Sequence, residues 1–499
     1  MVILFIPSVH AKDMKQSSPL KWAGTIARNL ADDGITIYFA MPHTSDGYRY
    51  DFEALVSRGH QNIIPFPVTI TSDTKLGLLA WGMDLLKLLT PRTSPIPFDA
   101  VITPCSAMVV PMYRCLTDAV YSRITPAVIT ILDVAASYDE FNRAPIGIQE
   151  WYQQWEYLEA GAALFGKVIT GNPYDYGVVQ RVYKKLFSLS RLKIAMSNLH
   201  MFWQPVAPVV DFTPRTAPQE GAEWKALAVG GFGTSREEMH EQAEMMVEAM
   251  EYFQRFTKLN MKLYVCTQTP PTTWHDEVQR RLGDRIEINF NPPRDRFQEL
   301  MRTCHFAINC RKYDGVNLAF LEQAIAGIPI IWCDSPYFRG WVYGGGFEET
   351  RFATVKSFDT AQLVVAIQKI IQNYPKACEV AEKFSRHVQK RHDAGVWREN
   401  MRKILTEAVQ QAQQRFWNGN FDVMNSAFAR AVKEVQECSF EELQKQIAQY
   451  TKTNILSLYG KHWILCMLRR HGLVEFVKNG ELFLRRATPY ERKKRSIKS

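Results

Sequence analysis

The stretch Arg311–Asp334, RKYDGVNLAFLEQAIAGIPIIWCD, predicts a loop, a helix and a buried strand in succession. After an Asp-Gly turn signal, apolar residues recur at helical spacing over residues 317–326. Gly327 and Pro329 end this helix, as a glycine just past the last turn and a proline soon afterwards commonly do. Because the apolar run Ile330–Trp332 follows at once, we interpret the stretch as one helix–strand unit of an α/β fold.

Two carboxylates belong to this unit, with seven residues between them: Asp314 precedes the helix and Glu322 lies along it. Backbone N–H groups at a helix start carry partial positive charge, so they can hold a phosphate or a hydroxyl-rich group. Carboxylates ahead of and along the helix can then accept hydrogen bonds from sugar hydroxyls. This pattern suits a nucleotide sugar, which has a hexose, a diphosphate and a ribose in line. The alternative is an ordinary αβ unit whose two acids are solvated.

The stretch resembles the donor-site motif of retaining GT-B glycosyltransferases, especially the GT4-like group. In that motif Glu, seven residues and Glu lead into an Ala-x-Gly-x-Pro helix end. The matching positions are Asp314, Gly315, Glu322, Ala324, Ala326, Gly327, Pro329 and Ile330. One departure is Asp314 in place of the first Glu, which shortens the reach by one methylene. The resemblance implies that Glu322 binds the donor ribose, and that the sugar is bound by Asp314, as a catalytic residue, and by the amides of Gly315, Val316 and Asn317.

The totals describe an ordinary protein with substantial cores. The 499 residues suffice for two or three domains, and 46% are hydrophobic and 22% charged. The nine cysteines are scattered without CxxC pairs, which predicts reduced thiols in a cytosol and argues against a zinc site or disulfide framework. No apolar run approaches transmembrane length, and Met1–Val9 is predicted to be a first strand rather than a signal peptide. We therefore expect a cytoplasmic protein without a membrane partner.

The first half begins with a strand, a helix and a strand over residues 2–6, 20–30 and 35–40, the start of a doubly wound domain. The polar loop at residues 10–24 would face the interdomain cleft of a GT-B enzyme; a loop without a ligand is the alternative. A later strand, Ala127–Leu132, ends at Asp133. The resembling family commonly has His-Asp there, and here Leu132 stands at the His position. Asp133 either positions sugar or acceptor hydroxyls in the catalytic site or caps a helix.

The second half opens with the strand Ala226–Val229, a glycine-rich turn and the helix Glu237–Phe256. Glycines allow backbone amides to approach a phosphate closely, so the turn is a candidate diphosphate cradle. The family has an Arg and a Lys here; by position Gly231 replaces the Arg and Arg236 replaces the Lys. The missing cation could come from Lys12, Arg311 or Lys312. The predicted donor-binding residues of this region are Gly231, Gly233, Thr234, Arg236 and Lys312.

Strands and helices alternate in both halves, and a proline-rich linker at residues 205–218 separates them. We therefore predict an α/β chain of the GT-B fold, with two facing Rossmann-like domains. Residues 1–215 would form the acceptor-side domain and residues 216–417 the nucleotide-sugar-binding domain. The long helix at residues 396–417 is expected to cross back onto the first domain, as it does in GT-B folds.

A third domain is predicted at residues 420–499. Residues 438–499 carry 13 Lys and Arg against five Asp and Glu, so +8 of the net charge of +9 lies there, which suggests a polyanionic partner. Helices at residues 422–436, 440–450 and 454–471 precede a hairpin with an Asn-Gly turn. This order resembles a winged helix-turn-helix domain, which implies DNA contacts; an RNA- or protein-binding module is the alternative. The predicted DNA-binding residues are Lys461, Arg469, Arg470, Lys478, Arg485 and Arg486, and the run Arg492–Arg495 adds charge.

Together these features predict a glycosyltransferase that moves a sugar from a nucleotide-sugar donor to a hydroxyl on a modified, hydroxymethylpyrimidine-type base in double-stranded DNA, with retention. The pairing of domains resembles the DNA-modifying enzymes of bacteriophages, which would place the protein in a host cytoplasm. The pattern requires no metal or other cofactor, and it leaves the oligomeric state open. The alternatives are a polysaccharide or glycan glycosyltransferase, and a DNA-binding regulator with an inactive GT-B fold.

Overall fold

The structure is a computed structural model of the whole chain. It describes the chain over the following residues: 1–7, 18–32, 34–42, 52–68, 98–104, 127–132, 163–164, 166–206, 208–233, 237–267, 270–310, 317–335, 338, 353–355, 359–417, 430, 433, 437–451, 473–479 and 481–486.

The N-terminal half is built on a seven-stranded parallel sheet with the order β3-β2-β1-β4-β5-β6-β7. Its strands are β1 Val2–Phe5, β2 Thr36–Pro42, β3 Ile63–Val68, β4 Ala100–Pro104, β5 Ala127–Leu132, β6 Lys167–Thr170 and β7 Leu199–Met201. Apolar side chains such as Ile3, Ile37 and Ile129 are fully buried in its core. The strands predicted at residues 2–6, 35–40 and 127–132 are therefore confirmed, with shifts of one or two residues at the ends of the first two.

Helices cover this sheet. α1 (Ser18–Leu30) and the short π-helix η1 (Glu53–Ser57) pack into its main core. α7 (Pro173–Leu186) and α8 (Leu189–Asn198) pack against β6 and β7. α7 starts where Asn172 caps it by accepting a hydrogen bond from the Asp175 amide at 2.8 Å, with Pro173 in the first turn.

The C-terminal half holds a second parallel sheet, of six strands in the order β10-β9-β8-β11-β12-β13. The strands are β8 Trp224–Val229, β9 Met261–Thr267, β10 Ile286–Phe290, β11 Phe306–Asn309, β12 Ile330–Cys333 and β13 Thr354–Val355. The helices are α9 Glu237–Phe256, α10 Thr273–Leu282, the 3-10 helix η2 Gly283–Arg285, α11 Arg294–Thr303, α12 Leu318–Ile325, α14 Thr360–Gln372 and α15 Tyr374–Arg391. α9 and α14 bury one face of the sheet, and α11 and α12 bury the other.

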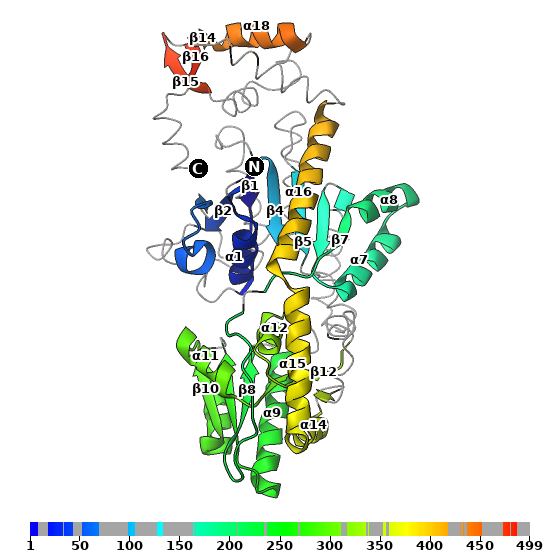
Figure 1. Cartoon of the computed structure of the whole chain (residues 1–499), viewed down its shortest axis with the longest axis vertical. Coiled ribbons are helices and arrows are strands. Elements are labelled where there is room, and N and C mark those ends of the chain that lie inside the picture. The colour runs from blue at the N-terminus through cyan, green and yellow to red at the C-terminus, as the bar shows by residue number, and fades with distance from the viewer. Residues whose placement is uncertain are drawn as a thin grey trace.

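The last long helix, α16 (Ala394–Trp417), joins the two halves. It starts after α15 in the C-terminal half and runs along the N-terminal half (Figure 1). Its buried residues Trp397, Met401 and Leu405 belong to the N-terminal core, and Arg398 donates a hydrogen bond to the carbonyl of Asn29 at 2.7 Å. The predicted return of this helix to the first domain is confirmed.

The linker between the halves is fastened to the C-terminal end of α12. The amide of Thr213 donates to the carbonyl of Ala326 at 3.2 Å. The guanidinium of Arg215 donates to carbonyls at the ends of α11 and α12: Met301 (2.6 Å), Arg302 (3.0 Å), Cys304, Ala326 (3.4 Å) and Gly327 (3.3 Å). Because helix C-termini carry unpaired carbonyls and partial negative charge, one cation satisfies both ends at once.

The described part of the tail forms a three-stranded antiparallel sheet with the order β14-β16-β15. Its elements are β14 Glu437–Ser439, α18 Phe440–Thr451, β15 Leu473–Lys478 and β16 Glu481–Arg486. The capping box predicted at Ser439 is present, because the Ser439 amide donates to Glu442 and the Glu442 amide donates to the Ser439 hydroxyl. The hairpin is also confirmed, and Asn479 in its turn has a φ of 53°. β14 was not predicted, and the helix predicted at residues 454–471 lies outside the described residues.

Within the described ranges, no helix is both long and apolar enough to cross a bilayer. Nor do the described residues contain a group of three or more His, Cys, Asp or Glu side chains that could hold a metal ion. All six cysteines in the described ranges are free thiols.

Candidate donor-binding site

The candidate site lies where the strand order of the C-terminal sheet reverses direction. β8 and β11 are neighbours, and the connection that leaves β8 leads to β9 on one side, whereas the connection that leaves β11 leads to β12 on the other. In doubly wound sheets such a switch point forms a crevice in which ligands bind. β8 and β11 pair from Ala226 with Phe306 to Ala228 with Ile308. The glycine-rich turn after Val229 and the end of β11 at Asn309 therefore lie at adjacent carboxyl ends of the sheet.

The turn after β8 is held by hydrogen bonds to the end of β9. The amide of Gly230 donates to the carbonyl of Cys266 at 3.0 Å, and the amide of Phe232 donates to the hydroxyl of Thr267 at 3.4 Å. Gly230 has a φ of 115° and Gly233 a φ of 152°, which L-residues with side chains rarely adopt. A Cβ on Gly231 would lie 2.4 Å from the sulfur of Met239 in α9. The backbone conformation therefore favours glycine at Gly230 and Gly233, and a side chain at Gly231 would have to displace Met239.

His275 in α10 fixes the same turn. Its Nδ1 accepts a hydrogen bond from the Thr272 amide at 3.0 Å, so the ring proton lies on Nε2. Nε2 then donates to the carbonyl of Phe232, also at 3.0 Å. Since His275 is only 3% exposed, the ring is a fixed support for the turn.

On the β11 side, α12 begins with a buried cap. The Oδ1 atom of Asn317 accepts a hydrogen bond from the Phe320 amide at 2.9 Å. The Nδ2 atom of Asn317 donates to Oδ1 of Asn309, at the end of β11, at 3.1 Å. Asn309 in turn donates to the side-chain oxygen of Gln323 at 3.3 Å. The side chain of Asn317 therefore makes its hydrogen bonds within the protein. The predicted contact of Asn317 with the nucleotide sugar can then involve only its backbone amide.

The end of α12 agrees with the sequence. Gly327 has a φ of 73°, the left-handed conformation that a glycine just past a helix adopts. Glu322 lies in the middle of α12 and is partly buried.

Cys310 directly follows β11, next to the site. Burial raises the pKa of its thiol well above the ordinary value, which keeps this cysteine protonated.

The predicted site residues fall into two groups. The structure describes Gly231, Gly233, Asn317 and Glu322, and it brings their two elements to adjacent strand ends. Asp314, Asp133, Thr234, Arg236, Lys312, Gly315 and Val316 lie outside the described residues. Asp133 directly follows Leu132, the last residue of β5.

Sequence reasoning missed four residues that shape this site: Asn309, Gln323, His275 and Phe212. Asn309 and Gln323 interrupt buried apolar runs, and such isolated polar residues were an available signal. His275 stands at the third helical position after Thr272, where a capping box usually has Glu or Gln. Phe212 lies within the proline-rich linker, and no local pattern indicates its contact with Gly327.

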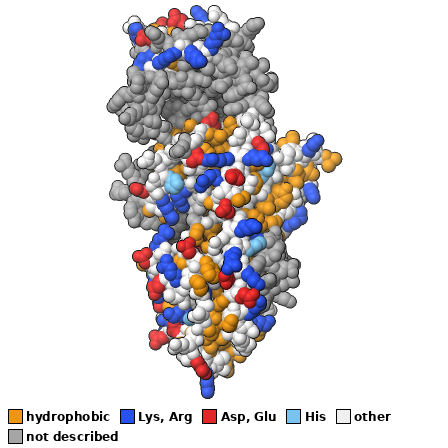
Figure 2. All heavy atoms as spheres, viewed as in Figure 1, with side chains coloured by type: hydrophobic (Ala, Val, Ile, Leu, Met, Phe, Trp, Pro, Cys, Tyr) orange, Lys and Arg blue, Asp and Glu red, His pale blue; other side chains and the backbone are white. Residues whose placement is uncertain are grey.

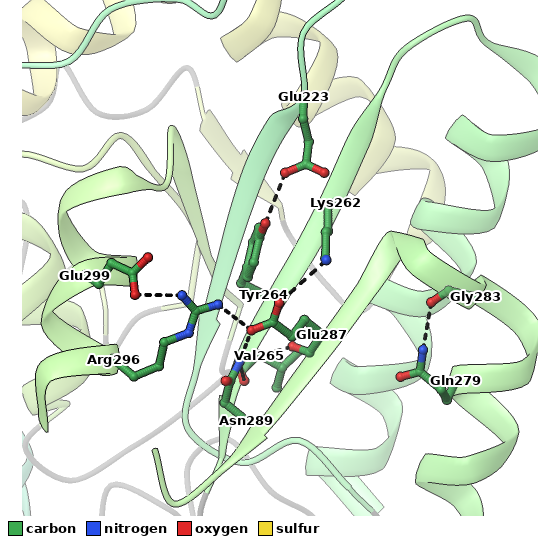
Figure 3. Close-up of polar contacts among 10 residues, drawn as sticks. All are labelled: Glu223, Lys262, Tyr264, Val265, Gln279, Gly283, Glu287, Asn289, Arg296 and Glu299. Atoms are coloured by element: carbon green, nitrogen blue, oxygen red, sulfur yellow. Dashed lines mark hydrogen bonds and ion pairs between the residues drawn. The ribbon is translucent and has the colours of Figure 1, made fainter. Parts of the chain in front are cut away.

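A second polar cluster lies at the outer edge of the same sheet (Figure 3). Glu287 in β10 pairs with Lys262 at 3.5 Å and with Arg296 at 2.5 Å, and the hydroxyl of Tyr264 donates to Glu223 at 3.0 Å. Although burial opposes ionisation, the hydrogen bonds from Arg296 and Asn289 lower the pKa of Glu287. Because the cluster is mutually paired and β10 is separated from β8 by β9, we interpret it as structural.

In the tail, the structure describes three of the six residues predicted to contact DNA. Lys478 pairs with Glu437 at 2.9 Å, and Arg486 donates to the carbonyl of Lys433. Arg485 donates to the carbonyl of Arg486 at 3.3 Å. Lys461, Arg469 and Arg470 lie outside the described residues. On the face in Figure 2, Lys and Arg are interspersed with Asp and Glu over the C-terminal half, without a large field of one sign.

Comparisons with known proteins agree on the fold. No family model matches the sequence, and no curated protein matches it. Among solved structures, the chain is similar to sucrose-phosphate synthase from Thermosynechococcus elongatus, with a TM-score of 0.58 and 14% identity over 84% of this chain and 100% of that one. It is similar to HepE of Anabaena, in complex with UDP and glucose, with a TM-score of 0.54 and 12% identity over 81% and 99%.

The chain is also similar to WaaG, a glycosyltransferase involved in lipopolysaccharide biosynthesis, with a TM-score of 0.52 and 12% identity over 81% and 100% of the two chains. At such low sequence identity, these structural likenesses are evidence for the fold alone. Two Rossmann-like domains built on parallel sheets, together with these likenesses, establish that the chain has the GT-B fold. The predicted fold class is confirmed for the two Rossmann-like domains; the winged helix remains a prediction.

Proposed function

We propose that this protein is a nucleotide-sugar-dependent glycosyltransferase whose acceptor is a hydroxyl on a modified base in double-stranded DNA. The observation that carries the first part is the meeting of two elements at the switch point of the C-terminal sheet. The glycine turn after β8 and the capped start of α12 follow adjacent parallel strands. Both elements can offer backbone N–H groups, which suit a diphosphate and a sugar.

The similar structures support this donor class. One of them is described in complex with UDP and glucose, and another is described as a glycosyltransferase. In our proposal Glu322 binds the ribose, and Asp314 with the amides of Gly315, Val316 and Asn317 binds the sugar. The diphosphate lies against Gly231–Thr234 and Arg236, with Lys312 as a further cation.

Catalysis in this arrangement depends on the leaving diphosphate. As the bond between the anomeric carbon and the diphosphate breaks, negative charge grows on the leaving group. Fixed N–H groups and cations that already point there stabilise that charge without reorganising. The acceptor hydroxyl oxygen bonds to the anomeric carbon on the face that the diphosphate leaves, and its proton passes to an oxygen of the leaving diphosphate, so configuration is retained. Asp133, directly after β5, is placed by our proposal among the acceptor hydroxyls, and the reaction proceeds without a metal or other cofactor.

The proposal that DNA is the acceptor is based on the tail of the chain. In a winged helix the strand before the second helix pairs with the last strand of the wing, and β14-β16-β15 with α18 has that order. The net charge of +8 over residues 438–499 matches a phosphate backbone. HepE and WaaG are covered almost completely by the match, whereas about one-fifth of this chain is left over. A base hydroxyl inside a duplex would be reached through the major groove or by base flipping.

Donor hydrolysis by the full chain, measured with and without hydroxymethylated duplex DNA, tests the proposal. We expect slow hydrolysis of at least one nucleotide sugar, and a changed turnover when the modified duplex is added. Turnover that ignores DNA would favour a glycan acceptor, as the likeness to WaaG suggests. DNA binding without any turnover would favour a regulator with an inactive GT-B fold.

A further inference from the structure

We propose that Asn309, Asn317 and Gln323 form a hydrogen-bonded relay that sets the position of α12, and that these three are positioning residues for donor binding. The relay joins the end of β11, the cap of α12 and the middle of that helix. The inference rests on the proposed donor site, but its structural part can be tested without a donor.

The direction of the relay is fixed by the backbone. The Phe320 amide can only donate, so Oδ1 of Asn317 must accept from it. Nδ2 of Asn317 then faces Asn309, at 3.1 Å, and can only donate to Oδ1. This leaves Nδ2 of Asn309 to donate to Gln323, at 3.3 Å, whose oxygen must accept. One helix-capping bond thus determines the orientation of three successive amides.

The relay is buried, which makes it energetically consequential. The exposed fractions of Asn309, Asn317 and Gln323 are 1%, 5% and 0%. The remaining donor, Nε2 of Gln323, is buried and has no hydrogen-bond partner among the residues that the structure describes. Leaving such a donor unpaired costs about 1–3 kcal/mol. Apolar side chains of similar size would avoid this cost, so stability alone does not explain the relay.

What the relay adds is a fixed rotation of α12 about its own axis. Successive helical residues point about 100° apart, so holding Gln323 inward sets the direction of the neighbouring Glu322. It also holds the first-turn amides against the end of β11, next to the turn after β8. A misplacement of about 1 Å in such a site can cost on the order of 100-fold in rate.

Two variants break the relay while conserving volume: Gln323→Met, and the double variant Asn309→Leu with Gln323→Met. Both remove the unpaired Nε2 of Gln323. The single variant leaves Nδ2 of Asn309 without its acceptor, and the double variant leaves Nδ2 of Asn317 without its acceptor. Because each variant exchanges one buried unpaired donor for another, urea denaturation should show stability within about 1 kcal/mol of the wild type. We nevertheless expect the KM for the nucleotide sugar in donor hydrolysis to rise about tenfold or more. The control is Gln298→Met in α11, whose side chain donates to the carbonyl of Val209 at 3.0 Å, outside α12. This variant should keep the wild-type KM.

Hydrogen exchange of the Phe320 and Leu321 amides in the donor-free protein gives the second readout. We expect faster exchange in both relay variants and no change in Gln298→Met. Unchanged exchange, or an unchanged KM in a folded relay variant, would overturn the inference. Faster exchange in a protein whose wild type binds no nucleotide sugar would refute the proposed function instead, since the relay would then position α12 for no donor.

Discussion

The ring of Phe212 in the linker lies directly against Gly327 at the end of α12. A Cβ built on Gly327 would stand 2.5 Å from the Phe212 ring, and the φ of this glycine is already 73°. We expect Gly327→Ala to destabilise the protein by about 2–4 kcal/mol, from the left-handed backbone and the clash together. Urea denaturation measures this. The matched control is Gly221→Ala, with a φ of 81° and open space around it, which should cost only about 1 kcal/mol.

Arg215 is predicted to be the main anchor of the linker, because its guanidinium serves carbonyls of both α11 and α12. Arg215→Met keeps much of the side-chain volume but leaves these carbonyls without their cation. We expect a loss of about 2–3 kcal/mol in the free energy of unfolding. The exposed neighbour Arg302→Met is the control, with a change within about 0.5 kcal/mol. Equal effects of the two substitutions would refute the anchoring role.

The stability of the protein should fall on mild acidification, through His392 at the end of α15. Its Nδ1 donates to the carbonyl of Gln204 at 2.6 Å. Burial lowers the pKa of His392 to about 4, with nearby Arg391 and His387 adding to the effect and the Gln204 carbonyl opposing it. Since this pKa lies below its unfolded value, the unfolded state binds more protons between about pH 6.5 and pH 4. Stability is therefore complete above this window and falls within it.

Urea midpoints at pH 7 and pH 5 test this. The His392 contribution should fall by about 2 kcal/mol between them, and His392→Asn should flatten the slope by that amount. Burial also lowers the pKa of His305 to about 4, so some acid sensitivity should persist in the variant. The exposed His60→Asn variant serves as the control and should keep the wild-type slope. A slope in His392→Asn as steep as in the wild type would contradict the assignment.

Glu322 should be required for donor binding. Glu322→Gln keeps the shape of the side chain and removes its charge, so the ribose hydroxyls lose a charged acceptor. We expect the affinity for a nucleotide sugar to fall about tenfold or more, from the 1.5–3 kcal/mol typical of hydrogen bonds to charged groups. Titration calorimetry measures it, with the exposed Glu399→Gln in α16 as the control. Unchanged affinity in Glu322→Gln would remove this residue from the site.

Much of this architecture could be predicted because local signals agreed with the fold. Helical spacing followed by Gly327 and Pro329 predicted α12 and β12, and the Ser439 capping box predicted the start of α18. These features depend on neighbours in sequence, which a single chain displays directly.

The rest depends on contacts between distant residues. Nothing near Asn309 in sequence reveals that it pairs with an amide eight residues away across a strand–helix turn. In the same way, Phe212 contacts Gly327 although β8 to β11 and α12 lie between them in the sequence. β14 was missed because it has only three residues, Glu437–Ser439, and its partner β16 lies some 45 residues further on.

The most direct test of the account is mass spectrometry of nucleosides released from hydroxymethylpyrimidine-containing duplex DNA after incubation with the full chain and a panel of nucleotide sugars. We predict a mass increase of one sugar residue on the modified nucleoside, dependent on one donor and formed more slowly with Glu322→Gln. An unchanged nucleoside mass across a broad panel, from a protein that still binds the duplex, would contradict the central claim.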